Sequence, residues 1–323
     1  MKRRAFLLAA IALPAFGQQA GRIYRLGLAV ATSLQFMKKF GTHKAFFEAL
    51  GRFGYVGGQN LVVESRDGEG RPEGFPRLVA ELVERKVEVL VVGNDQLAVA
   101  AKNATSSIPI VFAAAADPVG LGLVKTLARP GGNVTGIASF SETTISKQLE
   151  VLLEAFPSIR RVAVIGSADA ATAPLQLSAI REAARRLALD ISVHDLKAAA
   201  STQSMLDTIA RERPDALHVL PTIATFLEHE KIASFANQRR LPAIYGIGEQ
   251  VQIGGLMSYS ISLADNWRRI AEYVDKIFRG TKPADLPVQQ PIKFELAINL
   301  KTARALGLEI QRSVLIRADR VIE

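Results

Sequence analysis

Residues 108–136, IPIVFAAAADPVGLGLVKTLARPGGNVTG, combine a strand end, an open rim and a sharp return of the chain. The first five residues are mostly β-branched or aromatic, which is typical of a buried strand. Four alanines and Asp117-Pro118 follow, and the residue before a proline is pushed out of the helical region. Arg129-Pro130-Gly131-Gly132-Asn133 predicts a tight turn, because glycine permits positive φ. We expect this stretch to form a crevice wall beside a crossing between two lobes.

The remaining sequence alternates between short apolar segments and longer amphipathic segments. We expect strands at residues 23–30, 61–64, 87–92, 162–165, 191–194, 216–220 and 243–245, and helices at 38–53, 75–86, 96–105, 143–156, 174–187, 202–212, 223–237 and 265–279. Such alternation implies parallel sheets with helices on both faces. At 323 residues the chain suits two domains of ordinary size. The sequence therefore predicts an α/β protein with two doubly wound parallel-sheet lobes.

The N-terminus predicts an export signal over residues 1–17. Lys2, Arg3 and Arg4 form a basic segment, residues 5–15 are apolar, and Ala15-Phe16-Gly17 offers small residues for cleavage before Gln18. The apolar run is too short to span a bilayer. Residues 3–7, RRAFL, also resemble a twin-arginine export signal, and an ordinary general-secretion signal is the alternative. Both routes end outside the cytoplasm.

Composition narrows the function classes. The chain has no cysteine, which excludes disulfides, thiol catalysis and thiolate metal sites. Part of the formal net charge of +9 belongs to the predicted leader, and the other bases are spread along the chain. No dense Lys/Arg run is interleaved with aromatics, so we expect no nucleic-acid partner. The basic surface is either simply solvated or attracts an anionic ligand.

Enzyme signatures are incomplete in this sequence. Gly246-Ile247-Gly248 follows an expected strand, but Val251 stands where a dinucleotide-binding fingerprint needs a small residue. Gly120-Leu121-Gly122 meets Lys125 at the same position. The four histidines lie far apart, and no G-x-S-x-G elbow is present. We therefore predict no catalytic residues, no metal site and no cofactor.

In open parallel sheets, ligands bind at the carboxyl ends of the strands. The candidate residues at these ends and at the expected crossing are Thr32, Ser33, Gln35, Asn94, Asp95, Gln96, Asp117, Ser139, Ser167, Thr222, Tyr245, Glu249 and Tyr259. Hydroxyls, amides and free N–H groups at helix starts suit a carboxylate. Asp95, Asp117 or Glu249 can hold an ammonium, and the two tyrosines can stack on a ring. For each residue the alternative role is capping, turn formation or packing.

Several blocks of this chain resemble the periplasmic substrate-binding proteins of ABC transporters, in the family that includes tryptophan and other aromatic-amino-acid binders. The matching blocks are residues 54–60 (GYVGGQN), 108–111 (IPIV), 117–119 (DPV), 122–124 (GLV), 127–133 (LARPGGN), 135–136 (TG), 255–259 (GLMSY), 286–290 (LPVQQ) and 318–323 (ADRVIE). The resemblance spans nearly the whole chain after the leader. It points to amino acids as ligands, with aromatic ones first.

The resemblance also implies a type I periplasmic binding fold with three crossings between the lobes. We place the crossings near Ser139, near Ser262 and within residues 283–290. The first lobe would then comprise residues 22–138 and 263–284, and the second 139–262 and 285–323. The implied function is an extracytoplasmic, monomeric binding component that delivers a small molecule to an ABC permease and its ATPase. The alternatives are an α/β enzyme that uses the same cleft and the ligand-sensing half of a regulator.

Overall fold

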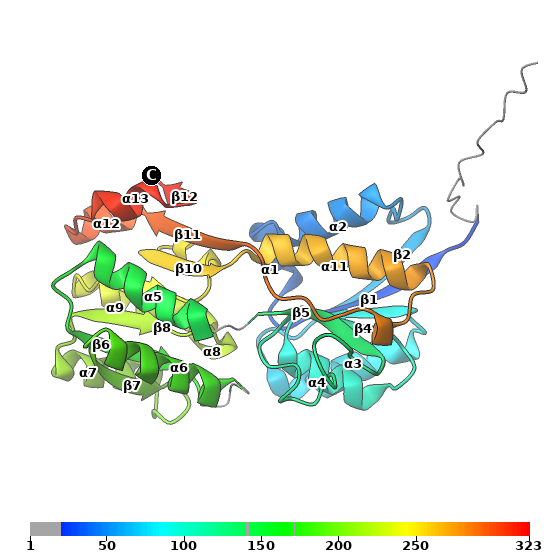
Figure 1. The fold of residues 1–323 in the computed structure, drawn as a ribbon, viewed down its shortest axis with the longest axis horizontal. Helices are drawn as coiled ribbons and strands as arrows, with labels where there is room; N and C mark the ends of the chain where they lie inside the picture. Colours follow the sequence, from blue (N-terminus) through cyan, green and yellow to red (C-terminus); the bar gives the residue numbers. More distant parts are fainter. Residues whose placement is uncertain (1–20, 140–141, 169, 171) are drawn as a thin grey trace, which may run out of the picture.

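The computed structural model describes residues 21–139, 142–168, 170 and 172–323, which form two lobes lying side by side (Figure 1). The predicted leader at residues 1–17 lies outside the described residues. Among the described residues, no helix combines the length and the apolar character needed to cross a membrane.

The first lobe contains a five-stranded sheet in the order β2-β1-β3-β4-β5. All neighbouring strands in it are parallel. Its strands are β1 (Tyr24–Val30), β2 (Leu61–Asp67), β3 (Val89–Val92), β4 (Ile110–Ala115) and β5 (Val134–Ala138). Every residue of β3 is buried, as expected for a central strand that has helices on both faces.

Helices cover both faces of this first sheet. They are α1 (Leu34–Lys39), α2 (Thr42–Arg52), α3 (Phe75–Glu84), α4 (Asp95–Ala104) and α11 (Leu263–Phe278), with short 3₁₀ turns η1 (Pro72–Gly74) and η2 (Pro283–Asp285). Helices α2 and α11 share one apolar core with the sheet, and α3 and α4 share the other. The single helix expected at residues 38–53 is instead two helices, because Gly41 adopts φ 77° between them.

Helix α11 belongs to the first lobe although it follows the strands of the second. Its Trp267 ring lies 5.5 Å from the ring of Phe46 in α2. Asp275, also in α11, accepts a hydrogen bond of 3.0 Å from the hydroxyl of Tyr55. Figure 1 shows α11 lying along α2 over the first sheet. One face of the first sheet is therefore completed by a segment from late in the chain.

The second lobe contains a seven-stranded sheet in the order β12-β11-β10-β9-β8-β6-β7. Its strands are β6 (Arg161–Gly166), β7 (Asp190–Asp195), β8 (Ala216–Val219), β9 (Ala243–Tyr245), β10 (Met257–Ile261), β11 (Phe294–Asn299) and β12 (Arg320–Ile322). Strands β10 and β11 pair antiparallel, and the other neighbours are parallel. The reversal follows from the path of the chain, which re-enters this lobe from the first one.

The helices of the second lobe also lie on both faces of its sheet. They are α5 (Glu142–Ala155), α6 (Ala173–Arg186), α7 (Thr202–Glu212), α8 (Ile223–Leu227), α9 (His229–Gln238), α10 (Glu249–Gln252), α12 (Leu300–Leu306) and α13 (Arg312–Ile316). One core contains α5 and α6, and the opposite core contains α7 and α9. The helix expected at 223–237 divides at Glu228 into α8 and α9. The predicted α/β fold class with two parallel-sheet lobes is confirmed.

The chain passes between the lobes at three places. Strand β5 belongs to the first sheet and α5 to the second lobe, and β10 and α11 likewise lie in different lobes, so we place the first two passages near Ser139 and near Ser262. Residues 286–289 remain attached to the first lobe, since Val288 N donates to Leu127 O at 2.7 Å and Gln289 N donates to Gly136 O at 3.1 Å. The third passage therefore follows Gln289 and precedes β11, so the linker expected at 283–290 lies largely along the first lobe.

Candidate functional site

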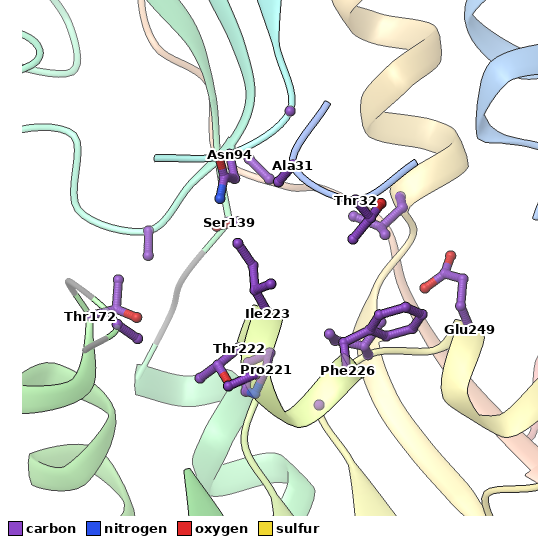
Figure 2. A pocket seen from close by; sticks show the side chains of 18 of the residues that line it. Ala31, Thr32, Asn94, Ser139, Thr172, Pro221, Thr222, Ile223, Phe226 and Glu249 are labelled. Atoms are coloured by element: carbon purple, nitrogen blue, oxygen red, sulfur yellow. The ribbon is translucent and has the colours of Figure 1, made fainter. Parts of the chain in front are cut away.

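A cavity of about 490 Å³ lies between the two lobes. Its walls come from the loops that follow β1, β3 and β4 in the first lobe and β6, β8 and β9 in the second. Strand ends of two parallel sheets thus face one another across it, which is where ligands bind in such sheets. Its volume falls within the range of small-molecule sites. Figure 2 shows the labelled lining residues approaching from both sides.

The polar groups of the first-lobe wall are largely bonded within that wall. Asn94 begins α4, and its side-chain oxygen accepts from Leu97 N at 3.0 Å. Asp95 accepts from Gln96 N at 2.9 Å. Burial raises the pKa of Asp95, while the backbone N–H groups of Gln96 and of Asp95 itself act in the opposite direction. Thr32 completes this polar surface at the end of β1.

Glu249 is the acidic residue of the second-lobe wall that lies deepest in the protein among the predicted site residues. Its side chain is buried at 7% exposure, and its Oε2 atom has no hydrogen-bond partner within the described part of the chain. Burial raises the pKa of this carboxyl, and the backbone N–H of Glu249 and then the charge of Arg320 partly offset that rise. In Figure 2 the carboxylate points into the space bordered by Thr32 and Phe226. A buried acceptor without a partner is costly, so the position favours a ligand that donates hydrogen bonds.

Two threonines add hydroxyl groups to the second-lobe wall. Thr222 begins α8 in a capping box, in which its Oγ1 accepts from Thr225 N at 3.1 Å. Oγ1 of Thr144 is buried and has no partner among the described residues. Beside them, Gln148 donates to Tyr259 O at 2.7 Å and its Oε1 lies 2.7 Å from His218 Nε2. Burial lowers the pKa of His218 to about 3, so this histidine stays neutral.

Apolar side chains connect the two lobes across the cavity. The rings of Phe36 and Phe226 meet edge to face with centroids 4.6 Å apart. Ile223, the first residue of α8, packs against a core of the first lobe. Gly70 also approaches Leu227 so closely that a Cβ on it would lie 2.5 Å from Leu227 Cδ1. These three contacts join residues of opposite lobes, so the structure shows a closed arrangement.

Seven of the residues predicted for the site line this cavity, namely Thr32, Asn94, Asp95, Gln96, Ser139, Thr222 and Glu249. Six others lie outside it, namely Ser33, Gln35, Asp117, Ser167, Tyr245 and Tyr259.

Local bonding and packing explain the positions of several residues that lie outside the cavity. Ser33 caps α1 by accepting from Phe36 N, and Asp117 accepts from Gly120 N within its own turn. Tyr245 is buried against His229. Tyr259 stacks on Phe294, with ring centroids 5.9 Å apart.

Sequence reasoning missed the apolar part of the cavity. Phe36, Ile223, Phe226 and Trp267 line it, and none was among the predicted site residues. A usable signal was present in α8, because an N-cap threonine is followed by apolar residues at the start of a helix at a strand end. Apolar residues at the start of such a helix can face the cleft, because the opposite lobe packs against them and shields them from water.

Within the described ranges, no three histidines, aspartates or glutamates gather closely enough to hold a metal ion. The lining also mixes hydroxyl, amide, carboxylate and aromatic groups from separate loops. This arrangement can hold a small molecule that is partly apolar and has at least one hydrogen-bond donor.

Comparison with known proteins identifies the family. The sequence profile of a family described as ABC transporter substrate binding protein matches residues 28–322. A tyrosine-binding protein of Clostridioides difficile (strain R20291) is 26% identical over 267 residues, which cover 82% of this chain and 76% of that protein.

Two solved structures are similar over almost the whole chain. A conserved domain protein from Vibrio cholerae O1 biovar El Tor is 27% identical with a TM-score of 0.86, and the match covers 93% of this chain and all of that one. An ABC domain from Streptococcus pneumoniae in complex with L-Trp is 24% identical with a TM-score of 0.83 and the same coverage. More distant neighbours include branched-chain amino-acid and leucine binding proteins, which have the type I periplasmic binding architecture.

Proposed function

The chain belongs to the family of ABC transporter substrate-binding proteins, and from that premise we propose that its ligand is an aromatic amino acid. The family consists of extracytoplasmic binding proteins and not of enzymes, so the predicted binding function is confirmed and the enzyme alternative is not. The ligand is a small molecule held between the lobes. Tyrosine and L-Trp, which are bound by the two relatives described above, are the first ligands to consider.

The observation that carries the proposal is the buried Oε2 atom of Glu249, which has no hydrogen-bond partner in the described part of the chain, in a cavity that also contains aromatic rings. An α-ammonium would donate to Glu249 Oε2. The ligand's carboxylate would lie on the second-lobe wall near Thr144, whose buried Oγ1 also has no partner in the described part of the chain and can donate a hydrogen bond. Its ring would pack against Phe36, Phe226 and Trp267.

A ligand in this position would touch both lobes at once. Glu249 and Phe226 belong to the second lobe, whereas Phe36 and Trp267 belong to the first. A ligand that contacts both walls stabilises the closed state by its higher affinity for that state. Closure would then present both lobes together to a membrane permease, which works with an ATPase. We propose that the protein performs this delivery as a monomer.

We propose the periplasm as the site of action, on the basis of the basic and apolar leader at residues 1–17. The mature chain would begin at or near Gln18, and N-terminal sequencing of the exported protein tests this. The choice between the twin-arginine and general-secretion routes is tested by replacing Arg3-Arg4 with Lys-Lys, since the twin-arginine route depends on that pair.

Calorimetric titration with L-Trp, L-Tyr, L-Phe, L-Leu and L-Asp tests the ligand class. We expect the three aromatic amino acids to bind more tightly than L-Leu, and L-Asp to bind weakest because Glu249 and Asp95 would repel its side chain. 3-Phenylpropionate, which has no ammonium, should bind at least about tenfold more weakly than L-Phe. Equal affinity for 3-phenylpropionate and L-Phe, or no binding of any amino acid, would overturn the proposal.

A further inference from the structure

A cluster of polar groups with few partners surrounds the Gly248–Glu249 turn in the second lobe. Three of its atoms are buried and have no hydrogen-bond partner in the described part of the chain, namely Glu249 Oε2, Arg320 Nε and Ser258 Oγ. Ser258 is completely buried, and Glu249 is nearly so. These residues come from three separate elements, β10, α10 and β12. Their convergence beside the cavity calls for a role beyond holding the fold together.

The backbone geometry at Gly248 brings Arg320 to this turn. A Cβ placed on Gly248 would lie 3.5 Å from Nη2 of Arg320 and 2.9 Å from Oγ of Ser260. The guanidinium therefore occupies the space next to the residue that precedes Glu249. Gly248 has an ordinary φ of −62°, so it is the lack of a side chain, not unusual backbone geometry, that matters here. Any larger residue would push the guanidinium or Ser260 away.

We propose that Arg320 is a positioning residue for ligand binding, whose guanidinium packs beside the Gly248–Glu249 turn and places its positive charge behind the Glu249 side chain that lines the cavity. The inference rests on the proposed function, in which Glu249 receives the ligand's ammonium. Arg320 does not line the cavity, so it acts on the ligand through Glu249. A residue in the last strand of the chain thereby takes part in recognition.

The charges that face Glu249 can be named element by element. Arg320, from β12, favours the ionised carboxylate, and Glu295, from β11, opposes it. Glu295 is itself paired with Lys293, whose Nζ lies 3.3 Å from its carboxylate, so part of its effect is offset. Burial of Glu249 works in the same direction as Glu295. The backbone N–H of Glu249 itself opposes protonation of the carboxyl, and Arg320 is the charged side chain that acts in the same direction.

Arg320→Gln tests the proposal through the pH dependence of ligand binding. In the wild-type protein, affinity for L-Phe should fall as the pH decreases through the range where Glu249 becomes protonated. A nearby opposite charge lowers a carboxyl pKa even without direct contact. Removal of the Arg320 charge should therefore move the midpoint of this fall to higher pH. Arg320→Lys, which keeps the charge, should restore much of the wild-type profile.

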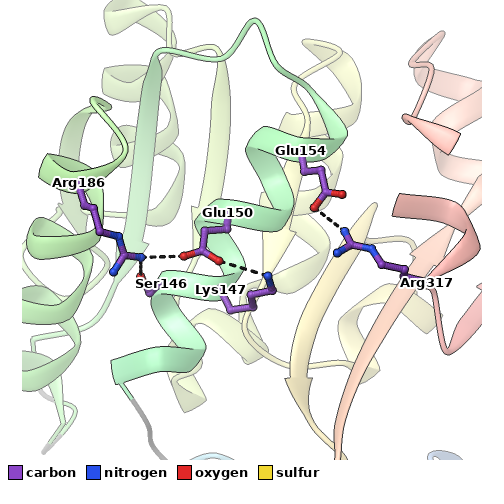
Figure 3. A network of polar contacts seen from close by, with 6 residues as sticks. All are labelled: Ser146, Lys147, Glu150, Glu154, Arg186 and Arg317. Carbon is purple, nitrogen blue, oxygen red and sulfur yellow. Dashed lines mark hydrogen bonds and ion pairs between the residues drawn. The ribbon is translucent and has the colours of Figure 1, made fainter. Parts of the chain in front are cut away.

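Arg317→Gln is the matched control. Arg317 lies on the same lobe and pairs with Glu154 across α13 and α5, in a surface network that also includes Glu150 and Arg186 (Figure 3). Arg317→Gln removes one positive charge, as Arg320→Gln does, but Arg317 does not face Glu249. We expect its pH profile to coincide with that of the wild type. A profile of Arg320→Gln that also coincides with the wild type would overturn the proposal.

A second measurement separates this inference from the proposed ligand. Side-chain ¹³C-labelled glutamate allows the titration of Glu249 to be followed by NMR in the ligand-free protein, with assignment from the signal lost in Glu249→Gln. The Glu249 signal should titrate at higher pH in Arg320→Gln than in the wild type. If it does while no amino acid binds, the proposed ligand is wrong and the positioning role stands. If ligand binds and the titration is unchanged, the positioning role is wrong.

Discussion

The two walls of the cavity differ in how their polar side chains are bonded. In the first lobe, the acceptor oxygens of Asn94 and Asp95 bond to N–H groups at the start of their own helix. In the second lobe, Glu249 Oε2 and Thr144 Oγ1 have no partner within the described ranges. Groups that are already bonded gain little from a ligand, whereas buried groups without partners gain a full hydrogen bond. The difference indicates that the second lobe provides most of the polar recognition.

The first lobe contributes mainly apolar contacts to the cavity. It supplies the rings of Phe36 and Trp267 and the close approach of Gly70 to Leu227. Contacts of this kind exclude water and depend on shape, and they form only when the lobes meet. In the proposed binding mode, the first lobe would therefore act mainly as an apolar cover for a ligand held by the second. Substitutions on the two walls should accordingly have effects of different size and kind.

The largest effect is expected for Glu249→Gln. Loss of a charge-assisted hydrogen bond to an ammonium costs about 1.5–3 kcal/mol, which weakens affinity about ten- to a hundredfold. Calorimetric titration with the best-binding aromatic amino acid measures this. The same change should raise the melting temperature of the ligand-free protein at neutral pH, because it removes a buried charge that has no hydrogen-bond partner at Oε2.

The sign of that stability change follows from the pKa of Glu249, which burial raises above that of the unfolded chain. A raised carboxyl pKa favours the folded state at low pH, and the advantage is lost as the pH rises through the folded-state pKa. Glu249→Gln should therefore stabilise the protein most at neutral and alkaline pH, and least near pH 4. A melting temperature that is lower than that of the wild type at every pH would contradict the assignment of Glu249 as an unpaired buried acid.

An intermediate effect is expected for Gly70→Ala, which tests the first lobe as a cover. The added Cβ would lie 2.5 Å from Leu227 Cδ1, so the closed state should be disfavoured. A cost of about 1 kcal/mol corresponds to about fivefold weaker ligand binding. Leu227→Ala in the same protein should recover most of this loss, because it removes the atoms that the new methyl group meets.

Gly58→Ala is the control for backbone strain. Gly58 has φ 79° and Gly70 has φ 73°, but a Cβ at Gly58 would meet nothing within 4 Å. Both alanines should lower the melting temperature of the ligand-free protein to a similar extent, since both are forced into positive φ. Only Gly70→Ala should weaken ligand binding. Equal losses of affinity in the two variants would show that the approach of Gly70 to Leu227 has no part in closure.

The smallest effect is expected for Asp95→Asn. The carboxylate of Asp95 already accepts from Gln96 N, and an asparagine oxygen can replace it there. We expect the affinity to change by less than about threefold, a difference below about 0.7 kcal/mol. A loss of affinity as large as that of Glu249→Gln in the same titration would show that Asp95 and Glu249 both contact the ammonium. It would contradict the inference that the second lobe provides most of the polar recognition.

Much of the fold follows from the periodicity of the sequence. Alternating apolar strands and amphipathic helices predict the parallel sheets, and the α7 and β9 ranges agree with the expected ones. Breaks within helices were harder to foresee. Gly41 and Glu228 interrupt segments whose apolar spacing looks continuous, and tertiary packing decides where such segments bend. No strand was predicted after residue 290, where the structure has β11 and β12, because apolar and polar residues do not alternate regularly in FELAIN and β12 has only three residues.

The site was predictable only in its polar part. The strand-end rule identifies Asn94, Thr222 and Glu249, because those positions follow from the sheet alone. It fails for Tyr245, the last residue of β9, whose side chain is buried under α9 beside His229. The apolar lining was not accessible from the sequence, because Phe36 and Phe226 become neighbours only when two separately folded sheets approach each other.

The order of elements along the chain has a consequence for biosynthesis. The last strand of the first sheet ends at Ala138, but α11, which covers one of its faces, ends at Phe278. At about 5–20 residues per second, a ribosome needs roughly 7 to 28 seconds to make the 140 residues from the end of β5 to the end of α11. During that interval the apolar surface that later meets Trp267 is bare. The first lobe, although begun earlier, cannot finish folding before most of the second has been synthesised.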